Sequence, residues 1–316
     1  MDAILGPLTV GELDQGDEIF RSAFSTYLGV DKETAWGDSD LFRTRWRARN
    51  TQVIAARMDG KLVGSNVLTR WGSLGWFGPL TVAPELWDQG IAKTLMVETE
   101  RVFEDWKVVH RALFTFPNSA KHIGLYQRFG YWPQRLTPIL ERRVDSTSLP
   151  SRLDGSARLF SETLPQERAE FLREIREIGD ALYPGLDLSG EVESVYHQHI
   201  GETILLFDDS RLIGFAVCHI GGRSETKSGR TYVKFAAISP GTARDRRRTA
   251  LLKSVETLAA HRGAPEVEFG CNTAHRDTYR SLVALGYRSE FIGVLMSSPD
   301  EPTYQRPELD VLNDLR

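Results

Sequence analysis

Hydrophobic and polar residues alternate along residues 52–68 in a pattern that predicts two β-strands. The pair Asp59-Gly60 lies between the two runs, and this dipeptide is the strongest short-range signal for a hairpin. Residues 75–82 predict a third strand, in which Gly78-Pro79 marks a bulge or bend.

A helical pattern and a further strand follow. From residue 91 onward, apolar residues recur at the spacing of one helix face, and residues 111–116 form another apolar run. A strand, a helix and a strand of these lengths make a βαβ unit, so we expect the strands at 75–82 and 111–116 to be parallel. The apolar residues of the helix face are Ile91, Leu95, Val102 and Trp106.

The turn into this helix is the most informative segment of the chain. It reads Trp87-Asp88-Gln89-Gly90-Ile91-Ala92, with small residues at Gly90 and Ala92 where a strand gives way to a helix. The unpaired N–H groups of a first helical turn and the positive end of the helix dipole together favour a bound pyrophosphate. Small side chains there let phosphates approach the backbone closely.

Three segments, in a fixed order, resemble motifs of the GNAT acetyltransferases. The turn at 87–92 is similar to the family's Gln/Arg-x-x-Gly-x-Gly/Ala motif, with Trp87 at its first position. Gly78-Pro79 lies where family members carry the bulge that splays two strands around the pantetheine arm of acetyl-CoA. Residues 118–131 resemble the pattern N-x-x-A-x-x-L-Y-x-x-x-G-F, although Ser119 occupies the position of its Asn and Asn118 comes one residue earlier.

The resemblance implies a set of cofactor-binding residues and one catalytic residue. Backbone groups at the helix start would hold the pyrophosphate, and strand residues would pair with the pantetheine arm. Tyr126 would protonate the departing thiolate, because a phenol pKa near ~10 is close to a thiol pKa near ~8.5; a core aromatic is the alternative. The implied cofactor-binding residues are Leu80, Thr81, Val82, Trp87, Asp88, Gln89, Gly90, Ile91, Ala92, Lys93, Thr94 and, at the pantetheine amides, Asn118 or Ser119.

The general base is left open by these motifs. Many relatives carry a glutamate on the bulged strand, but residues 76–82 contain no carboxylate. Glu85, His122, Asp38 and Asp40 are the candidates, and water is a further route for the proton. The sequence has no metal-ligand spacing, so we expect acetyl-CoA as co-substrate and no metal.

The second half of the chain repeats the first. Pro240 follows Pro84 by 156 residues, and Gly286 follows Gly130 by the same 156 residues. Earlier matches are offset by 150 residues, and the polar loop at 221–230 accounts for the difference. A fixed offset of this kind predicts a tandem pair of GNAT-like domains.

The two copies differ where the chemistry is expected. With the offset of 156, Arg246 and Arg248 occupy the positions of the two small residues in the first copy's turn, and Leu282 occupies that of Tyr126. Bulky side chains obstruct close approach of a pyrophosphate to the backbone, and leucine has no proton to donate. We therefore expect a degenerate, structural second domain; the alternative is that its arginines hold an anion by charge alone.

The expected fold class is α/β (α+β). Each of two GNAT-like domains would have a mixed, mostly antiparallel central sheet, a βαβ acetyl-CoA-binding unit and flanking helices. We expect the domains at 1–145 and 157–298, joined by a linker at 145–156. The residues 299–316 would form a C-terminal tail that lies over the surface or is mobile. In the family, helices that open each copy form one wall of the acceptor pocket; here they are predicted near 10–27, 40–49, 165–178 and 191–199.

Composition narrows the class of protein. A chain of 316 residues with 41% apolar and 26% charged residues is typical of a globular protein with two domains. It has no apolar run long enough for a membrane span, and its net charge of −4 argues against a nucleic-acid partner. Cys218 and Cys271 form no disulfide framework, so we expect two small buried residues in a cytoplasmic protein. The four arginines between residues 43 and 49 are expected on a solvated helix.

These observations predict an acetyl-CoA-dependent N-acetyltransferase. The primary amine of a small-molecule or peptide acceptor would attack the thioester directly in the N-terminal domain. The alternatives are a non-catalytic acyl-CoA-binding or regulatory module, and a transferase for a longer acyl group whose length Trp76 and Phe77 would limit. We expect a monomer or homodimer, with neither nucleic acid nor membrane as a partner.

Overall fold

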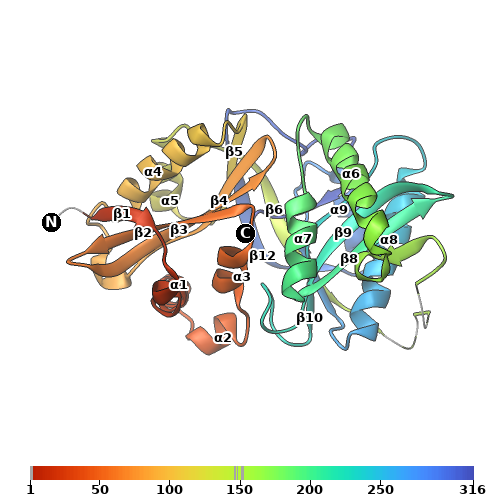
Figure 1. Cartoon of the computed structure of the whole chain (residues 1–316), viewed down its shortest axis with the longest axis horizontal. Coiled ribbons are helices and arrows are strands. Elements are labelled where there is room, and N and C mark those ends of the chain that lie inside the picture. The colour runs from red at the N-terminus through yellow and green to blue at the C-terminus, as the bar shows by residue number, and fades with distance from the viewer. Residues whose placement is uncertain (1–2, 146, 148, 151–152) are drawn as a thin grey trace.

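The computed structural model describes residues 3–145, 147, 149–150 and 153–316. Two halves lie side by side, and a single mixed sheet runs through both (Figure 1). Among the described residues its strand order is β1-β2-β3-β4-β5-β12-β6-β11-β10-β9-β8-β7, with β13 on β10. Residues 146, 148 and 151–152 of the predicted linker lie outside the described residues.

The first half follows the predicted order of strands and helices. β2 (Thr51–Met58) and β3 (Lys61–Trp71) form the hairpin, whose turn residues both have positive φ. β4 (Leu74–Val82) and β5 (His110–Thr115) are parallel and joined by α4 (Ile91–Asp105), which confirms the βαβ unit. The remaining elements are β1 (Ile4–Pro7), α1 (Leu13–Leu28), α2 (Lys32–Trp36), α3 (Leu41–Arg47), α5 (Ala120–Gln127) and β6 (Trp132–Arg143).

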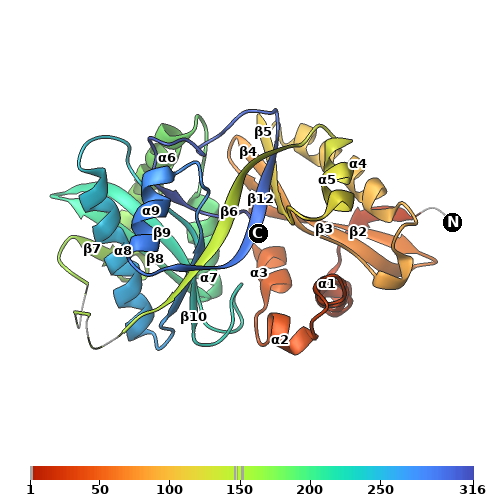
Figure 2. The same ribbon diagram turned by 180° about the vertical axis from the view of Figure 1, so that it is seen from behind.

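The second half repeats this arrangement. Its parallel pair, β10 and β11, corresponds to β4 and β5, and α8 connects them. Helices α6 and α7 lie on the face seen in Figure 1, and α8 and α9 lie on the opposite face, seen in Figure 2. The mostly antiparallel sheet between helices confirms the predicted fold class. The elements are β7 (Ala157–Leu159), α6 (Pro165–Leu182), α7 (Ser189–Gln198), β8 (Gly201–Asp208), β9 (Arg211–Ile220), β10 (Arg230–Ile238), α8 (Arg244–His261), β11 (Glu266–Gly270), α9 (Arg276–Ala284), β12 (Arg288–Ser298) and β13 (Val311–Leu312).

The last long strands of the two halves change places. β6 belongs to the first half by sequence, but it lies between β12 and β11. β12 belongs to the second half, but it pairs with β5. The two strands run next to each other between the halves (Figure 2). The domain bounds 1–145 and 157–298 stay a prediction based on the sequence repeat. The hydrogen-bonded sheet is continuous across the boundary between them.

The largest apolar cluster also spans the junction. Trp71 and Trp76 from the first half are fully buried and pack in edge-to-face contacts with each other. Trp71 also packs against Phe235 of β10, with ring centroids 5.5 Å apart. Trp76 therefore lies in the core between the halves, where it has no access to the strand gap that was expected to hold the acyl group.

The C-terminal segment is not the surface or mobile tail that the sequence predicts. Tyr304 is 1% exposed, and β13 pairs antiparallel with β10, with Val311 opposite Ala237 and Leu312 opposite Ala236. The segment then ends between the halves (Figures 1 and 2). Its prolines and charges are typical of a loop, and its burial comes from contacts with residues far away in the sequence.

Two further expectations have opposite outcomes. Cys218 and Cys271 are buried free thiols, as predicted. The arginine-rich helix α3 is not simply solvated, because Arg45 is 1% exposed and forms an ion pair with Glu225 across the junction. Throughout the part of the chain that the structure describes, no helix is both long and apolar enough to cross a membrane.

Candidate active site

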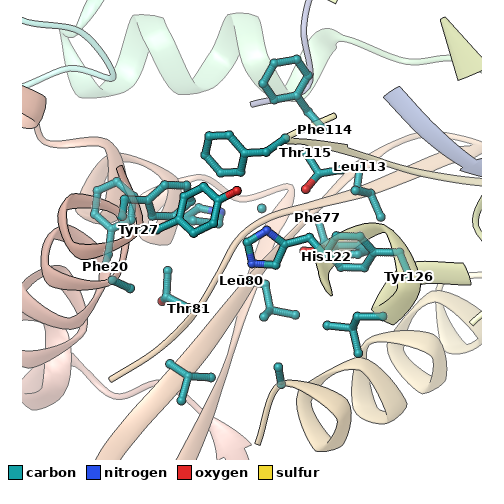
Figure 3. Close-up of a pocket in the computed structure, with 18 of the residues that line it drawn as sticks. Phe20, Tyr27, Phe77, Leu80, Thr81, Leu113, Phe114, Thr115, His122 and Tyr126 are labelled. Carbon is teal, nitrogen blue, oxygen red and sulfur yellow. The ribbon is translucent and has the colours of Figure 1, made fainter. Parts of the chain in front are cut away.

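A cavity of about 1050 Å³ opens where β4 and β5 separate. The parallel pairing runs from Leu74–His110 to Phe77–Leu113 and stops at Gly78-Pro79, where β3 also shifts its register against β4. The predicted bulge is therefore present. Side chains from α1, β4, α4, β5, α5 and β12 line the cavity (Figure 3).

The N-terminus of α4 borders one end of this cavity. Gly90 precedes the helix with a φ of 84°, a left-handed conformation that only glycine adopts without strain. Thr94 donates its N–H to the Gly90 carbonyl at 3.1 Å, so the N–H groups between them have no acceptor within the helix. This arrangement fits a pyrophosphate, because free N–H groups and the helix dipole favour an anion here.

Most of the predicted cofactor-binding residues line the cavity, and four do not. Gln89 and Thr94 lie beside the lining residues in sequence, and Asn118 is exposed. The Ser119 hydroxyl caps α5 by accepting the His122 backbone N–H at 3.4 Å. The binding roles of all thirteen stay predictions. The lining residues of this set are Leu80, Thr81, Val82, Trp87, Asp88, Gly90, Ile91, Ala92 and Lys93.

Tyr126 and His122 project from α5 into the centre of the cavity (Figure 3). Tyr126 packs edge-on against Phe77 with centroids 5.7 Å apart, and burial raises the pKa of its phenol above the usual value. Within the described residues its hydroxyl has no hydrogen-bond partner. The His122 ring lies 5.0 Å from the Tyr27 ring, and its Nδ1 is buried without a partner. Burial, reinforced by Lys121, lowers the pKa of His122, so this imidazole is neutral at pH 7.

The other candidate bases lie elsewhere. Glu85 is exposed in the turn after β4 and does not line the cavity. Asp38 accepts the backbone N–H of Ser228 at 2.9 Å, and Asp40 forms an ion pair with Arg43 at 3.1 Å. Of the four candidates from the sequence, His122 is the one that the fold brings next to Tyr126.

A buried charge cluster borders the cavity, and sequence reasoning missed it. Arg45 donates to Glu225 at 2.6 Å and to the Gly78 carbonyl at 2.7 Å, so it ties the bulge of β4 to the second half. Lys234 also contacts Glu225. Burial alone would raise the pKa of Glu225, but Arg45 and Lys234 hold it well below its usual range. No local signal predicts a pair whose members are 180 residues apart.

Six aromatic side chains form a continuous wall of the cavity, which we call the aromatic wall. Neighbouring members have ring centroids 4.4 to 6.1 Å apart. Their helical spacing in α1 predicts an apolar face, but the contributions from the other elements depend on the fold. The members are Phe20, Phe24 and Tyr27 of α1, Trp36 of α2, Phe116 after β5, and Phe291 of the exchanged strand β12.

In the second half, the corresponding gap is filled by the chain itself. With the offset of 156, Ala236 and Ala237 correspond to Leu80 and Thr81, and β13 pairs with them. At the start of α8, Arg244 and Arg248 bind the Asp310 carboxylate at 2.6 and 2.7 Å. A space of only about 20 Å³ is left there.

Comparison with known proteins agrees with this geometry. Residues 17–131 match the profile of the acetyltransferase (GNAT) family. A solved structure described as a tandem GNAT protein from the clavulanic acid biosynthesis pathway superposes with a TM-score of 0.58 at 13% identity, covering 96% of this chain and 100% of that one. Residues 17–131 therefore form a GNAT domain, and the whole chain has the fold of a tandem GNAT protein.

Other solved structures share the fold of the whole chain. A candidate acetyltransferase of Pyrococcus horikoshii has a TM-score of 0.69 at 14% identity and covers 98% of this chain and 93% of its own. A GCN5-related N-acetyltransferase of Sphaerobacter thermophilus has a TM-score of 0.57 at 15% identity, with 95% and 96% covered. No curated protein matches the chain. At these identities the likeness establishes the fold, and the GNAT profile match supports acyl-CoA-dependent acetyl transfer as a general class.

Proposed function

We propose that the protein is an acetyl-CoA-dependent N-acetyltransferase that works in the cleft of its first half. The observation that carries this proposal is the open gap between β4 and β5, with the N-terminus of α4 at one end and the unpaired Tyr126 hydroxyl inside. A binding or regulatory module would need the gap but would have no use for a proton donor at that place.

Acetyl-CoA would bind along the free edge of β4. The N–H groups at the start of α4 would bind the pyrophosphate, and Leu80 to Val82 would offer backbone groups to the pantetheine arm. Beyond Phe77 these residues pair with β3 on one side and have no β5 partner on the other. The bound group supplies a thioester, whose acetyl carbon is the electrophile.

His122 and Tyr126 would handle the two protons of the transfer. As the amine nitrogen bonds to the acetyl carbon, the neutral His122 imidazole accepts the proton that the nitrogen loses. As the carbon–sulfur bond breaks, the Tyr126 hydroxyl donates its proton to the thiolate. Both side chains lie on one face of α5, one turn apart, so base and acid act at neighbouring points of the cavity.

Replacing Tyr126 with Phe tests the proton donor. Because the ring packing is kept and the proton is lost, kcat should fall roughly a hundredfold or more while the acetyl-CoA Kd changes little. Thiol release and isothermal titration measure the two quantities, with Tyr279→Phe in α9 as the matched control. An unchanged kcat, under conditions where chemistry limits turnover, would return Tyr126 to the role of a core aromatic.

The base is tested by a pH profile. For the wild type, kcat/KM should fall as pH drops through the lowered pKa of His122, below its ordinary value of 6.5. His122→Gln should lose activity on the plateau and also lose this limb of the profile. A variant that keeps the same acid limb would exclude His122 as the proton acceptor.

A further inference from the structure

The part of the cavity beyond the catalytic pair is built differently from the cofactor end. Its surface is the aromatic wall, with Phe114 continuing it along β5. Figure 3 shows His122 between Tyr27 of this wall and Tyr126. An acceptor whose amine reaches His122 must therefore place the rest of its body against aromatic rings.

Several of the charged groups that line the cavity are already neutralised by protein partners. Glu225 binds Arg45, and Asp88 binds Lys121 at 2.5 Å near the cofactor end. The Arg316 side chain binds Glu268 at 3.1 Å. The other charged residues of the lining, Glu290, Lys93 and Arg128, are exposed to solvent. A second ammonium group or a carboxylate that the acceptor buries against the aromatic wall would therefore lose water without gaining a buried ionic partner, which costs free energy.

From this combination we propose that the natural acceptor is a primary amine on an aromatic body, with no second charged group. The proposal rests on the proposed function and narrows its acceptor. Offset-stacked and edge-to-face contacts with the wall favour a ring over an aliphatic chain. The apolar surroundings also favour the neutral form of the amine, which is the form that attacks a thioester.

One member of the aromatic wall comes from β12, so the second half contributes to the specificity for the acceptor. Phe291 reaches the cavity on β12, the strand that crosses from the second half, and contacts Phe116 at 5.5 Å. Phe116 in turn contacts Tyr27 at 4.6 Å and His122 at 6.1 Å. Through this line of rings, a strand of the second half positions the acceptor against the proton-accepting side chain.

A set of matched amines tests the proposal on the full chain with saturating acetyl-CoA. Phenethylamine should have a kcat/KM at least about a hundredfold above those of 1,4-diaminobutane, which adds a charge, and of phenylalanine, which adds a carboxylate. Hexylamine, which has neither a ring nor a second charge, should have a kcat/KM between that of phenethylamine and those of the two doubly charged amines. Thiol release and mass spectrometry of the product measure the transfer.

A variant of the wall adds an independent readout. Phe116→Leu keeps an apolar side chain but removes the ring, so KM for phenethylamine should rise about threefold to tenfold while KM for hexylamine changes little. Trp132→Leu, at a half-exposed position of β6 outside the cavity, is the control and should change neither. Unchanged acetyl-CoA binding verifies that each variant is folded.

The outcomes separate this proposal from the one it rests on. Equal or better turnover of diaminobutane or phenylalanine would overturn the aromatic acceptor and leave acetyl transfer standing. If octanoyl-CoA outperforms acetyl-CoA and the preference for a ring disappears, the wall serves an acyl chain and this inference fails. If the protein binds acetyl-CoA but acetylates none of these amines, the proposed function itself is contradicted.

Discussion

The strand gap of the first half and its counterpart in the second half start from the same backbone plan. In the first, the N-terminus of α4 borders a cavity of about 1050 Å³, and β4 has a free edge from Leu80 onward. In the second, β13 takes that edge of β10, and Asp310 lies at the start of α8. A carboxylate occupies the place where the first half has room for a pyrophosphate.

The arginines at this position of the second copy have a different role from the one that the sequence predicts. The sequence predicts that Arg246 and Arg248 obstruct the close approach of a phosphate to this turn. In the structure, Arg248 and its neighbour Arg244 bind Asp310, so the positive helix start is retained and its anion comes from the same chain. Asp310 thus supplies a structural anion at the place where the sequence predicts that no pyrophosphate binds.

The largest effect is expected from separating the halves. Residues 1–145 alone lack β12 beside β5, leave Arg45 without Glu225, and expose the buried faces of Trp71 and Trp76. Exposed apolar surface and an unpaired strand edge both favour aggregation, so this fragment should be largely insoluble or inactive. Co-expression with residues 146–316 should restore soluble protein and acetyl-CoA binding. A fragment that is monomeric, stable and fully active by itself would show that the exchange has no structural importance.

A smaller loss is expected from Asp310→Asn. Removing the charge leaves Arg244 and Arg248 without their buried partner, which should lower the free energy of unfolding by about 3 kcal/mol. Asp208→Asn is the control, because its half-exposed ion pairs with Arg246 and Arg247 should contribute less than about 1 kcal/mol. Urea titration measures both, and acetyl-CoA affinity should stay unchanged.

The pH dependence of this pair has a defined sign. Burial alone would raise the pKa of Asp310, but Arg244, Thr278 and Arg248 hold it below its ordinary value of 3.8. Its contribution to stability is therefore complete above that value and is lost as pH falls through the lower pKa of the folded state. The stability gap between wild type and Asp310→Asn should be constant from pH 7 to about 5 and shrink only in stronger acid. A gap that closes near neutrality would contradict the ion pair.

The smallest effect is expected from Gly90→Ala. The left-handed backbone at this position costs roughly 1–2 kcal/mol for a residue with a side chain, so the turn should relax and weaken acetyl-CoA binding about tenfold. Gly263→Ala after α8 has a similar φ of 67°, with open space around it, and should leave binding unchanged. Calorimetry should also give one equivalent of acetyl-CoA per chain. Two equivalent sites would mean that the second half also binds acetyl-CoA and that β13 leaves the edge of β10.

Local patterns predicted much of this fold, because they report local structure. The hairpin at Asp59-Gly60, the bulge at Gly78-Pro79 and the start of α4 at Gly90 each depend on neighbouring residues. The strand exchange does not: β6 and β12 occupy equivalent positions in the repeat, so no local feature distinguishes one pairing from the other. The burial of Tyr304 likewise depends on a strand gap more than 60 residues away in sequence.

The candidate site was predictable to a similar extent. Motif positions identified Tyr126 and the N-terminus of α4 as neighbours of one cavity, since both motifs have fixed spacing. His122 could be named as one of four bases but not selected, because selection needs the burial of its ring beside Tyr27. The pair of Arg45 and Glu225 was missed, since its members meet only after both halves have folded.

The exchange of β6 and β12 also affects how the chain folds during its synthesis. When β5 has been synthesised, its eventual neighbour β12 begins 173 residues further along the chain. At roughly 5–20 residues per second, the growing chain carries an unpaired, apolar strand edge for about ten seconds or longer. The first half thus emerges in an aggregation-prone form, and its completion waits for nearly the whole message to be read.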